Sequence, residues 1–431
     1  MPYEHDELNK RSAQREAYAR KRRAMQKRRM VRSIVTLVAI LIVCGIIGGV
    51  LLSRSSDTPT EPTLQQTQPP VTTLPPETQP QEPETVIKLT FGGDVNITDA
   101  SVAAGEQGGY YNYTEVFKDV VPALADADLT VLNFEGNLYG APYGTASSSA
   151  PQAMAEALKA AGVDMLQLAN SYTIANGIIG MKQTLDAVRS AGLEPLGVYG
   201  SNEEFQNSGG YTMVSIKGIR VAIVAFTKGM GSLGLPAGSE NCVNLLYSDY
   251  ASAYQKVNTA GITAILEAAN AQKPDVTIAL LHWGSEYNDI PSESQGEIVE
   301  LMQSMGVDAI VGTHPHYVQQ VVFDEQKGTV VAYSLGDFYG SGEKNGTYYS
   351  ILLNLQVTRN NLTGETKITS CSNTPIYILT PDRDGEPLRL MRMEAAIESY
   401  EGNHVDKITS VAYENMIYAL KRVNSRAETG K

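Results

Sequence analysis

Three of the five histidines stand in two short polar stretches that each follow an apolar run. His282 follows the run Val276–Leu281, and His314 and His316 follow the run Val307–Val311. Both runs have the length and composition of buried strands. Ligands of α/β folds bind at the carboxyl ends of such strands, so these imidazoles are expected to meet there. The pattern favours metal binding or catalysis over the alternative of polar loop residues or hydrogen-bonded core histidines.

Carboxylate and amide side chains follow other predicted strands. The run Val86–Phe91 leads into two glycines, which we expect to turn the backbone sharply and leave Asp94 at the strand tip. Two more apolar runs end just before Asn133 and Glu135 and just before Asn170. Carboxylate, amide and imidazole together suit a divalent ion such as Mn²⁺, Fe²⁺ or Zn²⁺. A pair of such ions generates hydroxide near neutral pH. For the two carboxylates the alternative is a loop cap or a surface charge.

Strand and helix alternate through the body of the chain, with polar residues at each strand exit. Apolar spacing predicts helices over 114–127, 151–161, 178–191, 250–271, 292–305 and, near the end of the chain, 405–423. Residues 211–226 predict an antiparallel hairpin through Lys217-Gly218. This order of elements predicts an α/β fold with a mostly parallel core and added antiparallel strands.

The amino-terminal part differs in composition from this body. Residues 1–32 are basic, 33–52 are uncharged and apolar, and 53–84 are rich in Pro, Thr and Gln. Twenty apolar residues after a basic tail predict a single-pass anchor with a cytoplasmic amino terminus and an extracellular body. The Pro/Thr/Gln-rich segment predicts a disordered stalk. A cleavable signal peptide is the alternative, but no clear small-x-small cleavage site follows the apolar segment. We expect residues 85–345 to form the main domain and 346–431 to complete it.

The charge balance and the motifs that are missing argue against several functions. Residues 1–54 hold 12 Lys/Arg against 4 Asp/Glu, whereas the rest of the chain holds 22 against 43, a balance of −21. An acidic body argues against nucleic-acid binding and against unaided binding of a polyanion. No Walker loop or Gly-x-Ser-x-Gly elbow is present, which argues against nucleotide-driven synthesis and serine hydrolysis in this chain. Cys242 and Cys371 allow one disulfide, and the sequence leaves their pairing open.

Six motifs occur in order between residues 86 and 380: Gly93-Asp94, Asn133-Phe134-Glu135-Gly136, Leu168-Ala169-Asn170, His282-Trp283-Gly284-Ser285-Glu286-Tyr287, His314-Pro315-His316 and Tyr333-Ser334-Leu335-Gly336-Asp337-Phe338. In these motifs and their order the chain resembles the capsule-synthesis CapA proteins, the poly-γ-glutamate biosynthesis proteins of the calcineurin-like metallophosphoesterase fold. The resemblance implies a four-layer αββα sandwich with a metal site at the strand ends.

The resemblance also implies roles for individual residues. It assigns metal binding to Asp94, Glu135, His282, His314 and His316, with catalytic roles for His282 and Glu135. Candidate substrate contacts are Asn133, Asn170, Tyr172, Trp283 and Glu286. Trp283 is the only tryptophan, and for an aromatic residue beside a strand end we favour a place in the core over a stacking platform.

The chain departs from the family's usual Ala-Asn-Asn-His motif. Here Ser171 replaces the second asparagine, Tyr172 replaces the histidine, and Ala175 replaces a following aspartate. A serine is a poor replacement ligand, and a phenol is a weaker acid than imidazolium near neutral pH. Asp337 also replaces an asparagine, a milder change. We therefore expect a site that is incomplete for two-metal hydrolysis and holds one metal or none.

Three functions follow as hypotheses. The first is a membrane-anchored, extracellular CapA-like protein that serves capsule or poly-γ-glutamate synthesis or export and contacts the polymer or its synthase subunits. The second is an extracellular metal-dependent hydrolase acting on a phosphoester, peptide or glycan. The third is a cell-surface binding module that uses the cleft without metal. The substitutions at Ser171 and Tyr172 favour the first and third over the second.

Overall fold

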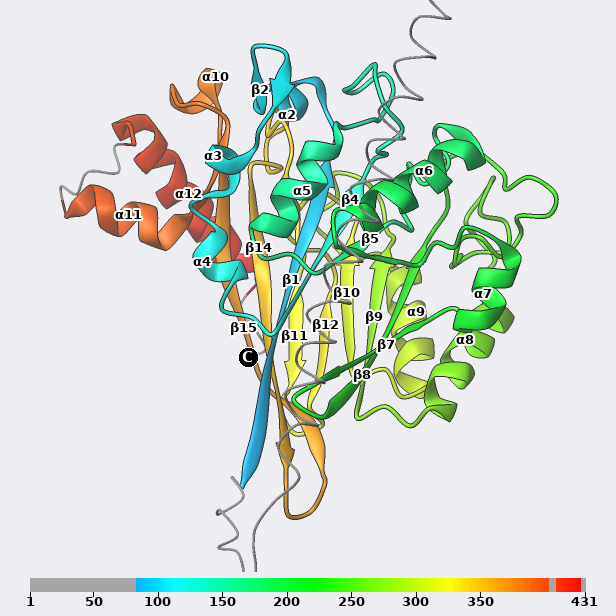
Figure 1. Ribbon diagram of the computed structural model, residues 1–431. Coiled ribbons are helices and arrows are strands. Elements are labelled where there is room, and N and C mark those ends of the chain that lie inside the picture. The colour runs from blue at the N-terminus through cyan, green and yellow to red at the C-terminus, as the bar shows by residue number, and fades with distance from the viewer. Residues whose placement is uncertain (1–82, 403–407, 428–431) are drawn as a thin grey trace, which may run out of the picture. The chain divides into compact units, whose positions relative to one another are not determined.

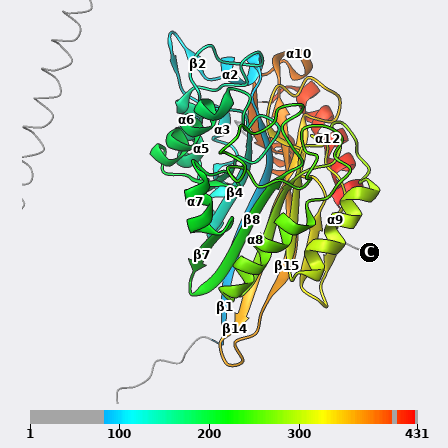
Figure 2. The ribbon, with the colours of Figure 1, turned by 90° about the vertical axis from the view of Figure 1, so that its right-hand side faces the viewer.

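The computed structural model describes residues 83–402 and 408–427. Two β-sheets face each other in it, and helices cover their outer sides (Figures 1 and 2). The larger sheet has the order β16 (Arg389–Arg392), β15 (Thr366–Leu379), β14 (Tyr349–Asn360), β1 (Glu84–Asn96), β4 (Leu129–Glu135), β5 (Met165–Gln167) and β6 (Glu194–Leu196). The short strand β13 (Asp337–Tyr339) also pairs with β1, in parallel. A separate small hairpin consists of β2 (Glu106–Gln107) and β3 (Tyr110–Tyr111).

The smaller sheet has the order β11 (Val321–Asp324), β12 (Thr329–Ala332), β10 (Ala309–Thr313), β9 (Val276–His282), β8 (Ile219–Thr227) and β7 (Thr212–Ile216). Strands β8, β9 and β10 run parallel, and every residue of β9 and β10 is buried. Strands that are covered on both faces need continuous apolar runs, which is why the sequence predicted them well. The predicted hairpin is confirmed as β7 and β8.

Helices and hydrophobic clusters complete four layers. One cluster lies between the two sheets, and a second joins the larger sheet to the helices α2 (Asp99–Ala103), α3 (Thr114–Phe117), α4 (Val121–Leu124), α5 (Gln152–Ala160) and α6 (Gly177–Ser190). The third joins the smaller sheet to α8 (Thr259–Ala271) and α9 (Glu293–Ser304), while α7 (Asn202–Ser208) precedes β7. The helix–sheet–sheet–helix order agrees with the predicted α/β sandwich.

The carboxyl-terminal part belongs to the same domain. Strands β14 and β15 extend the larger sheet beyond β1, and α11 (Met393–Glu401) and α12 (Ser410–Ala427) contribute to the cluster between the sheets. The short helix α10 (Pro381–Asp384) links β15 to β16. The predicted terminal helix over 405–423 is found as α12, five residues further along at its start, and α11 was not predicted. Residues 403–407 lie outside the described residues.

Two other predicted helices are shorter than expected. The segment predicted as one helix over 114–127 forms α3 and α4, and α4 begins with Pro122 in its first turn. Because proline has no backbone N–H to donate to a preceding turn, one continuous helix cannot run through Pro122, which explains the break between α3 and α4. The helix predicted over 250–271 begins only at Thr259, because the side chain of Asn258 accepts a hydrogen bond from the backbone of Gly261 and caps it.

The expected turn at Gly92 and Gly93 is wrong. Strand β1 continues through both glycines to Asn96, with a register irregularity between Phe91 and Asp94. A Cβ atom at Gly93 would lie 1.7 Å from the carbonyl oxygen of Gly336. The glycines therefore permit close approach of the neighbouring backbone, and they hold Asp94 inside the sheet rather than at a turn.

Three predicted segments lie outside the described residues: the tail (1–32), the anchor (33–52) and the stalk (53–84) except for its last two residues. Among the residues that the structure describes, no helix is long and apolar enough to cross a membrane. Cys242 and Cys371 are both free, so the disulfide that the sequence left open is not formed.

Candidate metal centre

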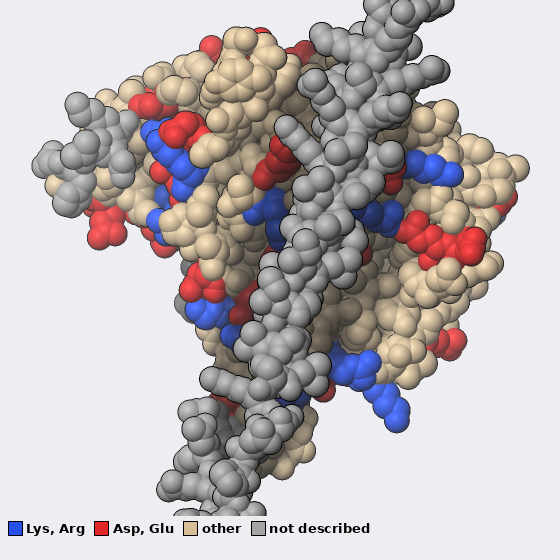
Figure 3. Space-filling view, viewed as in Figure 1, with Lys and Arg blue, Asp and Glu red and all other residues tan. Residues whose placement is uncertain are grey.

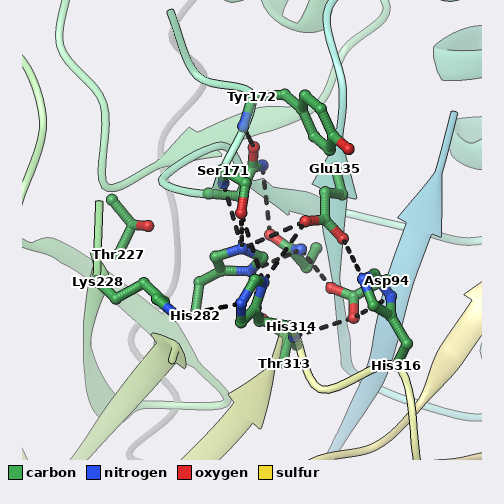
Figure 4. A network of polar contacts seen from close by, with 12 residues as sticks. Asp94, Glu135, Ser171, Tyr172, Thr227, Lys228, His282, Thr313, His314 and His316 are labelled. Carbon is green, nitrogen blue, oxygen red and sulfur yellow. Dashed lines mark hydrogen bonds and ion pairs between the residues drawn. The ribbon is translucent and has the colours of Figure 1, made fainter. Parts of the chain in front are cut away.

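Both sheets contribute side chains to one buried cluster at the carboxyl ends of their parallel strands (Figure 4). Asp94 on β1 pairs in register with Asn133 on β4. Glu135 is the last residue of β4, and His282 is the last residue of β9. His314 and His316 follow β10 directly. The predicted metal ligands Asp94, Glu135, His282, His314 and His316 are all buried and lie together.

The two histidines after β10 have an uncommon backbone conformation. The φ angles of His314 and His316 are 93° and 58°, in the region that residues with side chains seldom adopt. The backbone N–H of His314 donates to Oδ2 of Asp94 over 3.0 Å, which ties this loop to the opposite sheet. Strain of this kind concentrates at ligand sites, where surrounding contacts impose it.

Glu135, His282 and His314 form the first candidate ligand group, which we call the Glu135 triad. Oε1 of Glu135 lies 3.3 Å from Nε2 of His282 and 3.9 Å from Nδ1 of His314. One potential ligand atom from each residue lies within 4.8 Å of the others. Figure 4 shows the three side chains pointing toward one another.

The remaining carboxylate oxygen of Glu135 is an exception to normal hydrogen bonding. Oε2 is buried and accepts no hydrogen bond from the described residues, and its nearest recorded cation is Nε2 of His316 at 3.9 Å. A buried charged oxygen without a donor is costly unless a cation lies against it. Together with the imidazoles, this oxygen fits a divalent ion, and two histidines with one glutamate are a known zinc ligand set.

His316 and Asp337 form the opposite end of the cluster. Nδ1 of His316 lies 2.7 Å from Oδ1 of Asp337 and 3.6 Å from Oδ2 of Asp94. Asp94 also accepts a hydrogen bond of 2.5 Å from Nδ2 of Asn133. Asp94, Glu135 and His316 form a second group with metal-ligand spacing, and Glu286, His314 and His316 form a third.

The electrostatics of the two ends differ. Burial lowers the pKa of His282, and it lowers the pKa of His314 to about 4, so both imidazoles are neutral near pH 7. Burial also opposes the charge of His316, but the carboxylates of Asp337 and Glu135 raise its pKa well above the usual value. Burial disfavours the anion of Glu135, yet positive charge on the imidazoles of His282, when it is protonated, and of His316 holds the pKa of Glu135 well below the usual range.

Neighbouring residues orient the imidazole of His282. Its Nδ1 lies 3.2 Å from Oγ1 of Thr313, and its Nε2 lies 3.0 Å from Oγ and 3.2 Å from the backbone N of Ser171. The N–H of Ser171 requires a lone pair on Nε2, which places the ring proton on Nδ1 toward Thr313. The lone pair on Nε2 of His282 therefore faces Ser171, with Oε1 of Glu135 at 3.3 Å.

A cavity of about 640 Å³ opens beside His314. Tyr172, Glu286 and Lys228 line it, and so does Ser171. Burial, together with the charges of Glu135 and Glu286, raises the pKa of Tyr172 to about 12, so its phenol keeps its proton at neutral pH. Among the predicted substrate contacts, Tyr172 and Glu286 thus reach a cavity.

The remaining predicted substrate contacts lie inside the protein. Trp283 is fully buried, stacks on Tyr333 and donates from Nε1 to its carbonyl oxygen over 2.9 Å. Its assignment as a substrate contact is therefore wrong, and the core alternative fits. Nδ2 of Asn170 donates to the carbonyl of Phe134 over 2.6 Å, and Asn133 binds Asp94. Both asparagines therefore hold neighbouring residues of the site in place from the protein interior and do not face the cavity.

Sequence reasoning missed one charged residue of this region, Lys228, and undervalued Asp337 and Ser171. Asp337 was noted as a mild substitution, yet it forms the shortest recorded contact with His316. Lys228 directly follows β8, next to His282 at the end of the neighbouring strand β9, and its place after a predicted strand was the available signal. Ser171 contacts two of the histidines, at 3.0 Å and 3.4 Å.

Comparison with known proteins shows which family the chain belongs to. The model of the family described as bacterial capsule synthesis protein PGA_cap matches residues 88–341. This is more than half of the chain, and the chain belongs to that family.

Two curated relatives and one solved structure show the range of similarity. Capsule biosynthesis protein CapA of Bacillus anthracis is 30% identical over 237 residues, which are 53% of this chain and 54% of that protein. PGA biosynthesis protein CapA of Bacillus subtilis (strain 168) is 27% identical over 289 residues, 66% of this chain and 71% of that protein. The calcineurin-like phosphoesterase YfkN from Bacillus subtilis has 13% identity and a TM-score of 0.43, over 80% of this chain and 98% of that chain. The chain thus spans about half the length of the first relative.

Proposed function

We propose that this protein binds one divalent ion, Mn²⁺, Fe²⁺ or Zn²⁺, and acts at the cell surface in the synthesis or export of capsular poly-γ-glutamate. The observation that carries the metal assignment is the buried Oε2 atom of Glu135, which accepts no hydrogen bond from the described residues. His282 and His314 complete the Glu135 triad as neutral ligands. When bound, the ion would polarise an oxygen of an anionic group in the cavity.

Membership of the capsule synthesis family and the names of both Bacillus relatives support the role in polymer production. Contacts with the polymer or with synthase subunits are part of this proposal. The residues around the Glu135 triad support binding more strongly than turnover. Tyr172 stands where the family usually has a histidine, and with a pKa of about 12 its phenol is a poor proton donor at pH 7.

The anchor and the extracellular location are also proposals. They rest on the basic tail and the apolar segment 33–52. Strand β1 enters the body at Glu84 and reaches the site at Asp94, ten residues or roughly 33 Å further along. The first described strand therefore begins at the end of the body that lies away from the site.

A genetic complementation experiment tests the proposed role. Cells that lack this gene should lose surface glutamate polymer, measured as glutamate released by acid hydrolysis of washed cells. Wild type and the control Glu267→Gln, a substitution of an exposed residue on α8, should restore the polymer. Glu135→Gln should not restore it, although it is expressed and folded. Full polymer in the deletion strain would contradict the proposed role, and full restoration by Glu135→Gln would contradict a metal-dependent role.

The location needs a separate measurement. Protease treatment of intact cells should release a fragment that contains the folded body, while an amino-terminal tag stays protected. Protection of the body until the cells are lysed would contradict the extracellular location.

A metal-dependent hydrolase is the second candidate, and the cavity beside His314 favours it. We expect little hydrolysis of a phosphodiester such as bis-p-nitrophenyl phosphate by the metal-loaded wild type. The double substitution Ser171→Asn and Tyr172→His restores the residues usual in the family and should raise the rate by at least about 100-fold through an added ligand and a better acid. Rapid hydrolysis by the wild type would favour the hydrolase over the binding role.

A further inference from the structure

The cavity beside the metal centre contains a lysine that the proposed metal site does not use. Lys228 follows β8 and is half-buried. Its Nζ donates to the carbonyl oxygen of Gly284 over 2.7 Å and lies 4.8 Å from the centre of the Tyr254 ring. These two contacts fix the ammonium group in place, which lowers the entropy lost when it binds a ligand.

The charge of Lys228 has no ion-pair partner within 4.0 Å among the described residues. Glu286 lines the same cavity and attracts Lys228 electrostatically, but no ion pair between them is formed. Lys228 is the one lysine, and Glu286 the one carboxylate, among the described residues that line this cavity. The wall thus offers a fixed cation that is free to meet an anion.

His314 connects this lysine to the proposed metal. Its Nδ1 faces Glu135 and Ser171, while its Nε2 lies 3.4 Å from Nζ of Lys228. A neutral imidazole that presents a lone pair at Nδ1 to a metal carries its proton on Nε2. Two N–H donors then face each other at 3.4 Å, an arrangement that is favourable when one anionic oxygen accepts from both.

We propose that Lys228 and Nε2 of His314 bind a carboxylate group of the substrate, and that Lys228 is the residue that selects an acidic glutamyl unit over a neutral one. This inference rests on the proposed function in polyglutamate synthesis or export. Beyond residue 54 the chain carries a charge balance of −21. On the face seen in Figure 3 the visible Lys, Arg, Asp and Glu side chains are intermixed, with no broad basic patch among the described residues. A polyanion therefore needs a local cation to be held.

The size of the cavity agrees with an oligomeric ligand. A volume of about 640 Å³ lies within the usual range of ligand pockets, roughly 300 to 1,000 Å³. Tyr172 supplies a protonated phenol to the same wall and is a further hydrogen-bond donor. Lysine, histidine and tyrosine thus present donors, as a ligand rich in carboxylate and carbonyl oxygens requires.

The test is calorimetric titration of the full-length, metal-loaded protein with a γ-linked glutamate pentamer. The matched pentamer of γ-linked isoglutamine units, in which an amide replaces each free α-carboxylate, and inorganic phosphate serve as comparison probes. Wild type should bind the glutamate pentamer at least about 10-fold more tightly than the isoglutamine pentamer, because a charge-assisted hydrogen bond is lost. Lys228→Met should weaken glutamate binding about 10- to 100-fold and remove the preference.

Three variants make the result specific. Lys228→Arg, which keeps the charge, should retain most of the preference, whereas Lys228→Gln should lose it. Lys182→Met removes an exposed lysine on α6 and should change nothing. Metal content should equal that of wild type in every variant. Loss of metal in both Lys228→Met and Lys228→Gln would overturn the assignment, because Lys228 would then support the metal site.

Other outcomes separate this inference from the proposed function. Equal glutamate binding by wild type and Lys228→Met would overturn the inference and leave the proposed function intact. Binding of phosphate but not of the pentamer would overturn the carboxylate assignment. A metal-loaded wild type that binds neither pentamer would contradict the inference, and the complementation experiment then shows independently whether the role in polymer production survives.

Discussion

The two ends of the buried cluster contain similar residues in opposite electrostatic states. At the Glu135 triad, His282 and His314 are neutral, and one oxygen of Glu135 has no hydrogen-bond donor among the described residues. At the other end, His316 is bonded to Asp337 over 2.7 Å, and its pKa is raised well above the usual value. The carboxylates around His316 favour its protonated form, whereas the Glu135 triad presents neutral imidazoles and a carboxylate oxygen without a donor. This difference is the reason that the proposed single metal is placed at the triad.

Removing one imidazole from each end should give the largest contrast. His282→Ala removes a ligand of the Glu135 triad and should weaken metal binding more than about 100-fold. Even the loss of a residue that only orients a ligand lowers metal affinity about 10- to 100-fold. His316→Ala should retain the metal within about 10-fold. Competition with a chromogenic chelator measures both affinities. A larger loss in His316→Ala would reverse the comparison.

Acid should destabilise the metal-free protein because His314 takes up a proton more readily in the unfolded chain. Because the pKa of His314 is about 4 in the folded chain and about 6.5 in the unfolded chain, the unfolded chain binds more protons between these values. The free energy of unfolding should therefore fall as pH decreases from 6.5 to 4, by roughly 3 kcal/mol from this group. His316 has the opposite sign, since its raised pKa stabilises the fold below pH 6.5 and this stability is lost as pH rises through the folded value.

Urea unfolding in the presence of a chelator separates the two contributions. Between pH 6.5 and pH 4.5, His314→Gln should lose less stability than wild type, because its acid-sensitive group is absent. His316→Gln should keep the acid loss of the wild type and show a flatter dependence above pH 6.5. Identical slopes for wild type and His314→Gln in the acid range would contradict the assignment.

Replacing Asp337 by asparagine restores the residue usual in the family and tests the ion-paired end. Asp337→Asn should lower the pKa of His316, because the closest opposite charge is removed. Nitrogen-15 NMR of the imidazole resonances across pH measures the shift. An unchanged pKa would assign the raised value to Asp94 and Glu135 instead.

Of these four predictions, the substitution of Ser171 should have the smallest effect, which is on metal affinity. Ser171→Ala removes the hydroxyl near His282 and His314 and should lower metal affinity about 10-fold by loosening the ligands. Tyr172→Phe, the matched control in the same loop, should leave metal affinity unchanged. A larger loss in Tyr172→Phe than in Ser171→Ala would show that the phenol supports the metal site.

The sequence predicted the strands of the site better than its details, for physical reasons. Strands β9 and β10 are covered on both faces, so their apolar runs were plain, and the histidines at their ends could be placed together. The helix predicted from residue 250 instead starts after the cap at Asn258, because local hydrogen bonds of the preceding loop decide that boundary.

Long-range contacts account for what the sequence could not give. Asp337 is 21 residues from His316 and meets it only because β13 pairs with β1. The burial of Trp283, and the orientation of Asn133 and Asn170 toward the protein interior, also depend on packing between distant segments. Residue type and strand position predict which residues lie near the site. The direction of each side chain depends on tertiary contacts, which the sequence does not reveal.

Anomalous diffraction at the absorption edge of the bound metal tests the central claim most directly. Crystals of the metal-loaded protein should show one strong peak per chain among Glu135, His282 and His314, within about 2.0–2.3 Å of a carboxylate oxygen and two imidazole nitrogens. A main peak between Asp94 and His316, or equal peaks at both ends, would contradict the account, as would no peak from protein that was saturated with metal before crystallisation.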